Sequence, residues 1–92
     1  MPNDIAVTCD PAPGGWPCRV AVGGPGPATT CEVSVRAADL ARLAPGAADP
    51  ADLVERSFAF LLAREPKTSI LARFDLPLIG RYFPDYEREI RR

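Results

Sequence analysis

Histidine is absent from this chain, and that absence excludes a large part of enzyme chemistry. Without an imidazole there is no Ser-His-Asp triad, no Cys-His dyad and no histidine ligand for a metal ion. No apolar run approaches the roughly 20 residues that a transmembrane helix needs. The first residues also lack the basic and long apolar regions of a signal peptide. We therefore expect a cytoplasmic protein without membrane contact.

An excess of positive charge is missing as well. The chain has 11 Lys and Arg against 12 Asp and Glu, which gives a net charge of −1. Proteins that bind duplex DNA usually carry a basic face that displaces the counterions of the phosphates. The charge balance therefore disfavours a nucleic-acid partner.

Cysteine is scarce, and the three that occur are Cys9, Cys18 and Cys31. They form no Cys-x-x-Cys pair, so neither a zinc site nor an iron–sulfur site is indicated. Each alternates with polar residues beside Val or Ile, which is typical of buried thiols. A reducing compartment would keep all three as thiols. The alternative is a thiol-dependent enzyme that uses one of them as its nucleophile.

The first third of the chain shows a clear strand pattern. Residues 4–36 contain three stretches in which apolar and polar residues alternate, separated by Gly- and Pro-rich turns at 10–15 and 23–27. Such alternation predicts half-buried antiparallel strands. The simplest register pairs Cys9 with Trp16 and Val22 with Thr29. This register turns all three cysteines toward the core and makes Cys18 and Cys31 diagonal neighbours, roughly 7 Å apart, which is wide for a disulfide.

The remainder of the chain predicts helices. A short helix is expected at 37–44, and a longer one is capped by Asp49, begins at Pro50 and runs to about Glu65. Short helical pieces are expected at 68–73, 76–82 and 85–92. The predicted fold class is α+β: a three-stranded antiparallel meander followed by helices packed on one face. We expect a single domain over 1–92, with the β-meander at 4–36 and the helical part at 37–92.

One run in the C-terminal half is distinctive. Residues 60–84 read FLLAREPKTSILARFDLPLIGRYFP. The chain resembles a family of short, uncharacterised bacterial proteins that carry an FLLxREPKxSILxxFDLxxIxRYFP-like run after a β-rich N-terminal half. The resemblance implies no activity, ligand or catalytic residue.

Two polar or aromatic segments remain as candidate contact sites. Arg64 and Lys67 lie at a joint between helices, where they bind an anion or simply accompany a helix cap. Arg81 and Tyr82 precede Phe83, for which we expect a core position, and Tyr82 is expected to be exposed. Aromatic and Arg side chains are typical anchors of protein interfaces. On the last helix, the i,i+4 pair of Tyr86 and Ile90 is expected to face inward.

These features predict a small interaction or regulatory module without catalytic machinery, not an enzyme. The partner is another protein or a second copy of the chain. The candidate contact residues are Arg64, Lys67, Arg81 and Tyr82, and we name no catalytic, cofactor-binding or metal-ligating residue. Two alternatives to this module remain. One is the thiol-dependent enzyme, and the other is a weak nucleic-acid binder that uses the C-terminal Arg/Tyr segment: Arg81, Tyr82, Tyr86, Arg88, Arg91 and Arg92.

Overall fold

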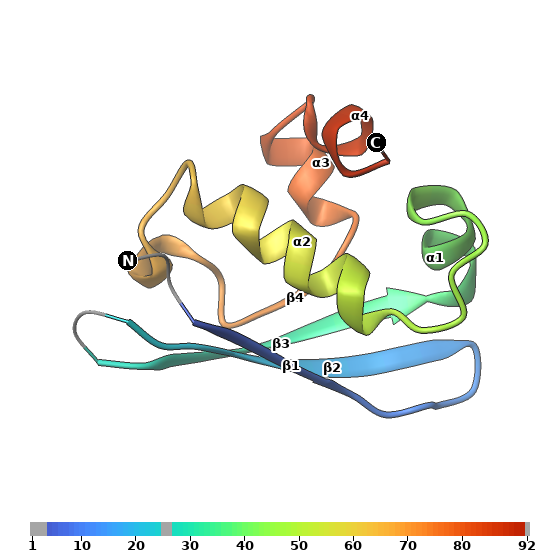
Figure 1. Ribbon diagram of the computed structural model, residues 1–92, viewed down its shortest axis with the longest axis horizontal. Helices are drawn as coiled ribbons and strands as arrows, with labels where there is room; N and C mark the ends of the chain where they lie inside the picture. The colour runs from blue at the N-terminus through green and yellow to red at the C-terminus, as the bar shows by residue number, and fades with distance from the viewer. Residues whose placement is uncertain (1–3, 25–26, 92) are drawn as a thin grey trace.

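The computed structural model describes residues 4–24 and 27–91, and within these ranges four strands form one sheet in the order β1-β2-β3-β4. Strands β1 (Ile5–Cys9), β2 (Gly15–Val22) and β3 (Thr29–Arg36) are antiparallel, whereas β4 (Arg73–Asp75) lies parallel to β3. Helices cover one face of the sheet and leave the other open (Figure 1). The predicted α+β class is therefore confirmed.

The predicted alternation and the register between β2 and β3 are both seen. Val22 pairs with Thr29 as expected. Cys18, Val20, Cys31 and Val33 are buried under the helices, while the residues between them are exposed. The inner face of the sheet thus supplies one side of the hydrophobic core.

The predicted register between β1 and β2 is wrong by two residues, because Cys9 lies opposite Cys18 and not Trp16. The turn explains the shift. Ala12 and Gly15 exchange backbone hydrogen bonds of 2.9 and 3.1 Å, which closes a tight turn over Pro13-Gly14. Gly14 has φ +83°, the conformation that the third position of a type II turn requires. A shift of two residues keeps each side chain on its predicted face.

This register also corrects the prediction of three free thiols. Cys9 and Cys18 form a disulfide, and their Cα atoms are 4.0 Å apart. In the next residue pair, Asp10 donates its N–H to the Pro17 carbonyl, so the cysteines occupy a non-hydrogen-bonded pair, where opposite side chains come closest. Cys31 remains a free and buried thiol.

The fourth strand was not predicted, so the sheet is mixed and not a purely antiparallel meander. Where a helix is expected at 68–73, the structure has only the short 3-10 helix η1 (Lys67–Ser69). The backbone is already extended at Ile70. Glu32 donates its N–H to the Ala72 carbonyl (2.7 Å), and Leu76 donates to Ser34 (2.9 Å). The open edge of β3 therefore fixes a segment that is too short to show an alternating pattern of its own.

The other helices of the described chain lie close to the predicted ranges. They are α1 (Ala37–Leu43), α2 (Ala51–Leu62), α3 (Leu78–Tyr82) and α4 (Tyr86–Ile90). The N-cap residue of α2 is Pro50 and not Asp49, one residue later than predicted, but the Asp49 carboxylate still accepts the Ala51 N–H at 2.7 Å and so satisfies a free donor at the helix start. The helix ends at Leu62, a little earlier than the predicted end near Glu65.

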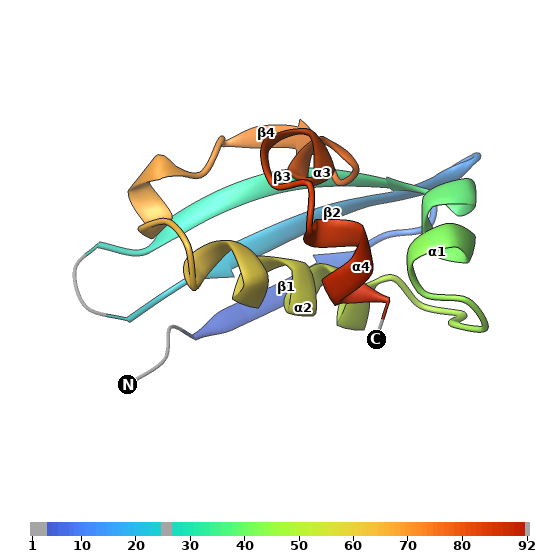
Figure 2. The ribbon, with the colours of Figure 1, turned by 90° about the horizontal axis from the view of Figure 1, so that it is seen from above.

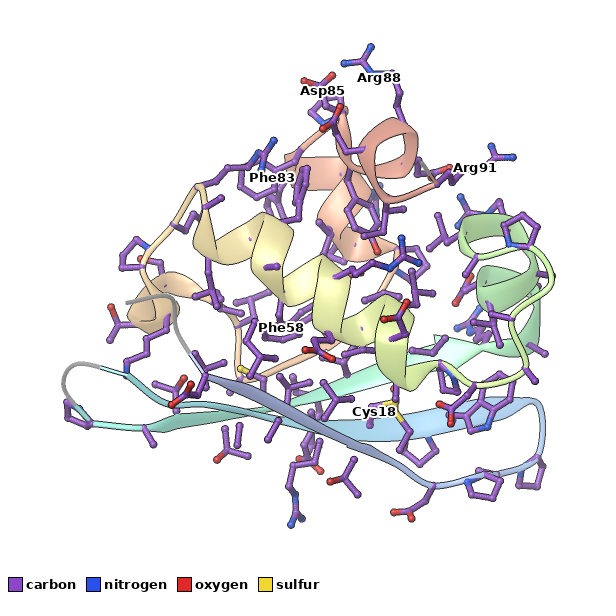
Figure 3. The ribbon with its side chains drawn as sticks, in the orientation of Figure 1. Cys18, Phe58, Phe83, Asp85, Arg88 and Arg91 are labelled. Carbon is purple, nitrogen blue, oxygen red and sulfur yellow. A yellow bond between two sulfur atoms is a disulfide. The ribbon has the colours of Figure 1, made fainter. Side chains whose placement is uncertain are left out.

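Helix α2 is central to the core. Its Phe58 points at the sheet (Figure 3) and stacks on Phe74 of β4, with 6.1 Å between ring centroids. Its other side packs on α4, where Tyr86 is fully buried and its hydroxyl oxygen lies 2.6 Å from Ser57 Oγ. Sheet, α2 and the C-terminal helices therefore share one core.

The C-terminal aromatic side chains divide differently from the prediction. Tyr86 and Ile90 face inward as expected, and Tyr82 is exposed. Phe83, which we expected to be the core plug, is only half-buried and touches Phe60 edge-on at 5.9 Å. Tyr86 takes the core position, because α4 begins where its first residue contacts Ser57 and Phe60 of α2.

Candidate functional site

An apolar cleft of about 220 Å³ opens between the end of α2, η1, β4 and α3. Leu61 lies at its α2 side, Leu71 and Phe74 come from the segment around β4, and Leu78 and Tyr82 come from α3. Four separate pieces of the chain meet here. The cleft is therefore a product of tertiary packing, and no local sequence pattern marks it.

The two large apolar side chains that are exposed in the described chain both line this cleft. Leu71 is 49% exposed and Tyr82 is 66% exposed. Removing a Leu side chain from water contributes roughly 1.5–3 kcal/mol. Leu71 is about half-exposed, so a partner that covers this rim would gain about half of that contribution, and exposed apolar patches of this kind are typical of protein-binding sites.

Of the predicted contact residues, Tyr82 lines the cleft, whereas Arg81 is exposed but is not among the lining residues. Arg64 and Lys67 instead have partners within the chain. The Arg64 guanidinium stacks on the Phe60 ring at 3.6 Å and donates to the Phe60 carbonyl at 3.0 Å. Lys67 Nζ donates to the Gly23 carbonyl at 3.3 Å. Arg64 thus packs on the end of its own helix α2, and Lys67 links η1 to Gly23, the residue after β2.

The polar groups that line the cleft are few. Glu65 and Ser69 lie at its wall. Over the ranges 4–24 and 27–91, no group of three or more Cys, Asp or Glu side chains is placed to hold a metal ion. The arrangement provides apolar contact area with a polar border, which suits binding.

The free thiol of Cys31 is a poor nucleophile. The side chain is 2% exposed, and burial raises the pKa of the Cys31 thiol. The thiolate is the reactive form of cysteine, so a raised pKa makes that form scarce at neutral pH. Cys9 and Cys18 are joined to each other. This chemistry disfavours the thiol-dependent enzyme.

One of the residues of the nucleic-acid alternative is not available on the surface. Tyr86 is fully buried, so it is not available to stack on a base. Arg88 pairs with Asp85 at 2.9 Å. Asp85, Arg88 and Arg91 point into solvent from the C-terminal part of the chain, away from the sheet (Figure 3). Arg92 lies outside the described residues. Tyr82 is the exposed aromatic that remains.

The edge of the sheet beside the cleft is open. Figure 2 shows β4 at the border of the ribbon, on the opposite side of the sheet from β1. The bonds of Ala72 and Leu76 to β3 turn the N–H and C=O groups of Arg73 and Asp75 outward. An open strand edge is a template for pairing with another chain.

On the exposed face of the sheet, Arg73 reaches across to β3 and pairs with Glu32 at 2.7 Å. The hydrogen bond and charge of Arg73 lower the pKa of the Glu32 carboxyl. Asp75 lies 3.9 Å from Arg36. The charges at this edge therefore alternate in sign.

Comparison of the chain with models of protein families, with curated proteins and with solved structures found no match. No helix within residues 4–24 and 27–91 has both the length and the apolar character needed to cross a bilayer.

Proposed function

We propose that this chain is a small protein-interaction module whose contact surface consists of the apolar cleft and the β4 edge. The observation that carries the proposal is the placement of Leu71 and Tyr82, the exposed large apolar side chains of the described chain, on the rim of one cleft. Scattered exposed apolar residues are ordinary, but a shared patch around a hollow is typical of an interaction site.

The occupant that fits is a protein surface with a large apolar anchor side chain. An apolar cavity of roughly 150 Å³ holds a benzene molecule. The cleft of about 220 Å³ is thus large enough for an aromatic or branched aliphatic side chain. The exposed Tyr82 on the rim supplies the kind of aromatic contact that is common at protein interfaces, and the exposed Arg81 is its neighbour in the chain.

Site-specific cross-linking in living cells tests this function. A photoreactive phenylalanine derivative replaces Tyr82 in one variant, Leu71 in a second and Glu55 in a third. Glu55 is exposed on α2 but does not line the cleft, so it serves as the matched control. We expect the first two variants to cross-link to the same identified protein and the control to give no such product.

Three results would count against the proposal. Equal cross-linking from Glu55 would show that contact is not confined to the cleft. No protein product from Tyr82 or Leu71 would show that the cleft is not a protein-binding surface. Cross-links to nucleic acid from Tyr82 would favour the nucleic-acid alternative instead.

A cytoplasmic location is part of the proposal, as is membership of the short bacterial family that the C-terminal run resembles. The Cys9–Cys18 disulfide bears on the location, because disulfides are rare in reducing cytosol. A cytoplasmic module therefore has to retain its fold with this pair reduced. Melting curves with and without reductant measure that directly.

A further inference from the structure

The two edge strands of the sheet, β1 and β4, differ in how well each could pair with the same strand of a second copy of the chain. At β1, the bonds of Asp4 to Gly23 and of Asp10 to Pro17 leave Ile5, Val7 and Cys9 with outward backbone groups. At β4, Arg73 and Asp75 have the outward groups. Each edge offers unpaired donors and acceptors, so the side chains decide which edge accepts a copy.

We propose that two copies of this chain pair through β4, antiparallel and about a two-fold axis at Phe74. This inference rests on the proposed function, because it identifies the protein that contacts this surface. In this register the backbone N–H and C=O of Arg73 bond to those of Asp75 of the second copy. The two-fold axis repeats the same pair at the other end, and the two sheets become one.

The charges favour this register. The pairing sets the Arg73 guanidinium beside the Asp75 carboxylate of the second copy, and the reverse. Both side chains are exposed, at 79% for Arg73 and 59% for Asp75, so each can meet a second copy as well as its partner on β3. The row across the seam then alternates in sign, from Glu32 through Arg73 to Asp75 and Arg36 of the second copy. Opposite charges directly across strands stabilise the pair.

The β1 edge lacks this self-complementarity. The pairing that uses all three of its outward residues is centred on Val7. That register sets Asp4 opposite Asp10 of the second copy at both ends of the strand. Like charges directly opposite destabilise a strand pair. Charge repulsion therefore disfavours pairing of two β1 edges, whereas opposite charges favour pairing of two β4 edges.

The apolar rim lies on the same side of the molecule. Leu71 precedes β4 in the chain, and Tyr82 shares the cleft with Phe74. Joining two β4 edges brings both rims to the seam and covers apolar area in addition to the backbone bonds. The strand has only three residues, so we expect a weak dimer that forms and separates with concentration.

A pair of charge reversals tests the register. Arg73→Asp gives an edge with two carboxylates, and Asp75→Arg gives an edge with two guanidinium groups. Each variant alone then places like charges across both ends of the seam. Mixed together, the two variants again place opposite charges across it. Glu55→Arg, an exposed charge reversal on α2, is the control.

Sedimentation equilibrium between about 1 μM and 1 mM measures the outcome. We expect the wild type and Glu55→Arg to form a reversible species of twice the chain mass. Each β4 variant alone should associate at least about tenfold more weakly, and the equimolar mixture should regain wild-type association. Melting curves should agree within about 3 °C, because both sites are exposed.

A wild type that stays monomeric over this range would overturn the inference. So would β4 variants that associate like the wild type, or a mixture that stays as weak as its components. The proposed function is separable from these outcomes. If self-pairing fails but Tyr82 still cross-links to a different protein in cells, the interaction surface stands and only its partner is wrong.

Discussion

Truncation of Tyr86 to alanine should be the most damaging single change in the C-terminal third of the chain. The side chain is fully buried, its ring contacts Phe60 edge-on at 5.4 Å between centroids, and its hydroxyl bonds to Ser57. Large aromatic truncations in cores cost about 3–5 kcal/mol. A domain of this size has about 5–14 kcal/mol of stability in all. Tyr86→Ala should therefore remove at least about a fifth of it.

The neighbouring aromatic residues, Phe83 and Tyr82, should lose less unfolding free energy than Tyr86 when they are truncated to alanine. Phe83 is half-buried, so Phe83→Ala should cost about 1–2 kcal/mol, below the range for full burial. Tyr82 is 66% exposed, so Tyr82→Ala should change stability by less than about 0.5 kcal/mol. The expected order of destabilisation is thus Tyr86, Phe83, Tyr82.

The hydroxyl of Tyr86 can be tested separately. Ser57 Oγ donates its only proton to the Leu53 carbonyl at 2.7 Å, so the short contact with Tyr86 requires the tyrosine to donate. Tyr86→Phe removes that donor but leaves Ser57 bonded, and we expect a cost of about 1 kcal/mol. Urea unfolding followed by circular dichroism measures all four variants. If Phe83→Ala costs as much as Tyr86→Ala, or if Tyr86→Phe costs nothing, this description of the core is wrong.

Three further outcomes are expected. Denatured without reductant, the protein should show one free thiol, that of Cys31, and reductant should release Cys9 and Cys18; three thiols before reduction would contradict the disulfide. Asp49→Ala removes the acceptor of the Ala51 N–H at the start of α2 and should cost about 1 kcal/mol, which lowers the melting temperature by roughly 4–8 °C; an unchanged value would mean that this bond is not used. Burial raises the pKa of Tyr86 to about 12 against an ordinary value of 10.0, so its contribution is fully present below pH 10 and is lost as the pH rises through 12. Urea melts between pH 9 and pH 12 should show a steeper loss in the wild type than in Tyr86→Phe, and parallel curves would count against the buried phenol.

The parts of the fold that were predictable are those that local residues determine. Alternation over several residues identified the three antiparallel strands, and the Asp49-Pro50 pair identified the start of α2. The position of Tyr82 after Arg81 at a helix end was sufficient to predict its exposure. In each case the signal lies within a single segment, so no knowledge of distant contacts was needed.

The remaining features depend on contacts between distant segments. β4 has three residues, and its strand conformation comes from the edge of β3. The disulfide depends on the turn at Pro13-Gly14, because a two-residue difference in register decides whether Cys9 meets Cys18 or Trp16. The cleft depends on how α2, η1 and α3 pack. None of these contacts leaves a periodic pattern in the sequence.

Hydrogen exchange at individual backbone amides most directly tests whether the β4 edge is where this chain meets another. The Arg73 and Asp75 amides point outward from β4, and the Val7 amide points outward from β1. If two copies pair as proposed, exchange at Arg73 and Asp75 should slow as the protein concentration rises, while exchange at Val7 stays unchanged. Equal exchange at all three amides, independent of concentration, would contradict pairing at β4.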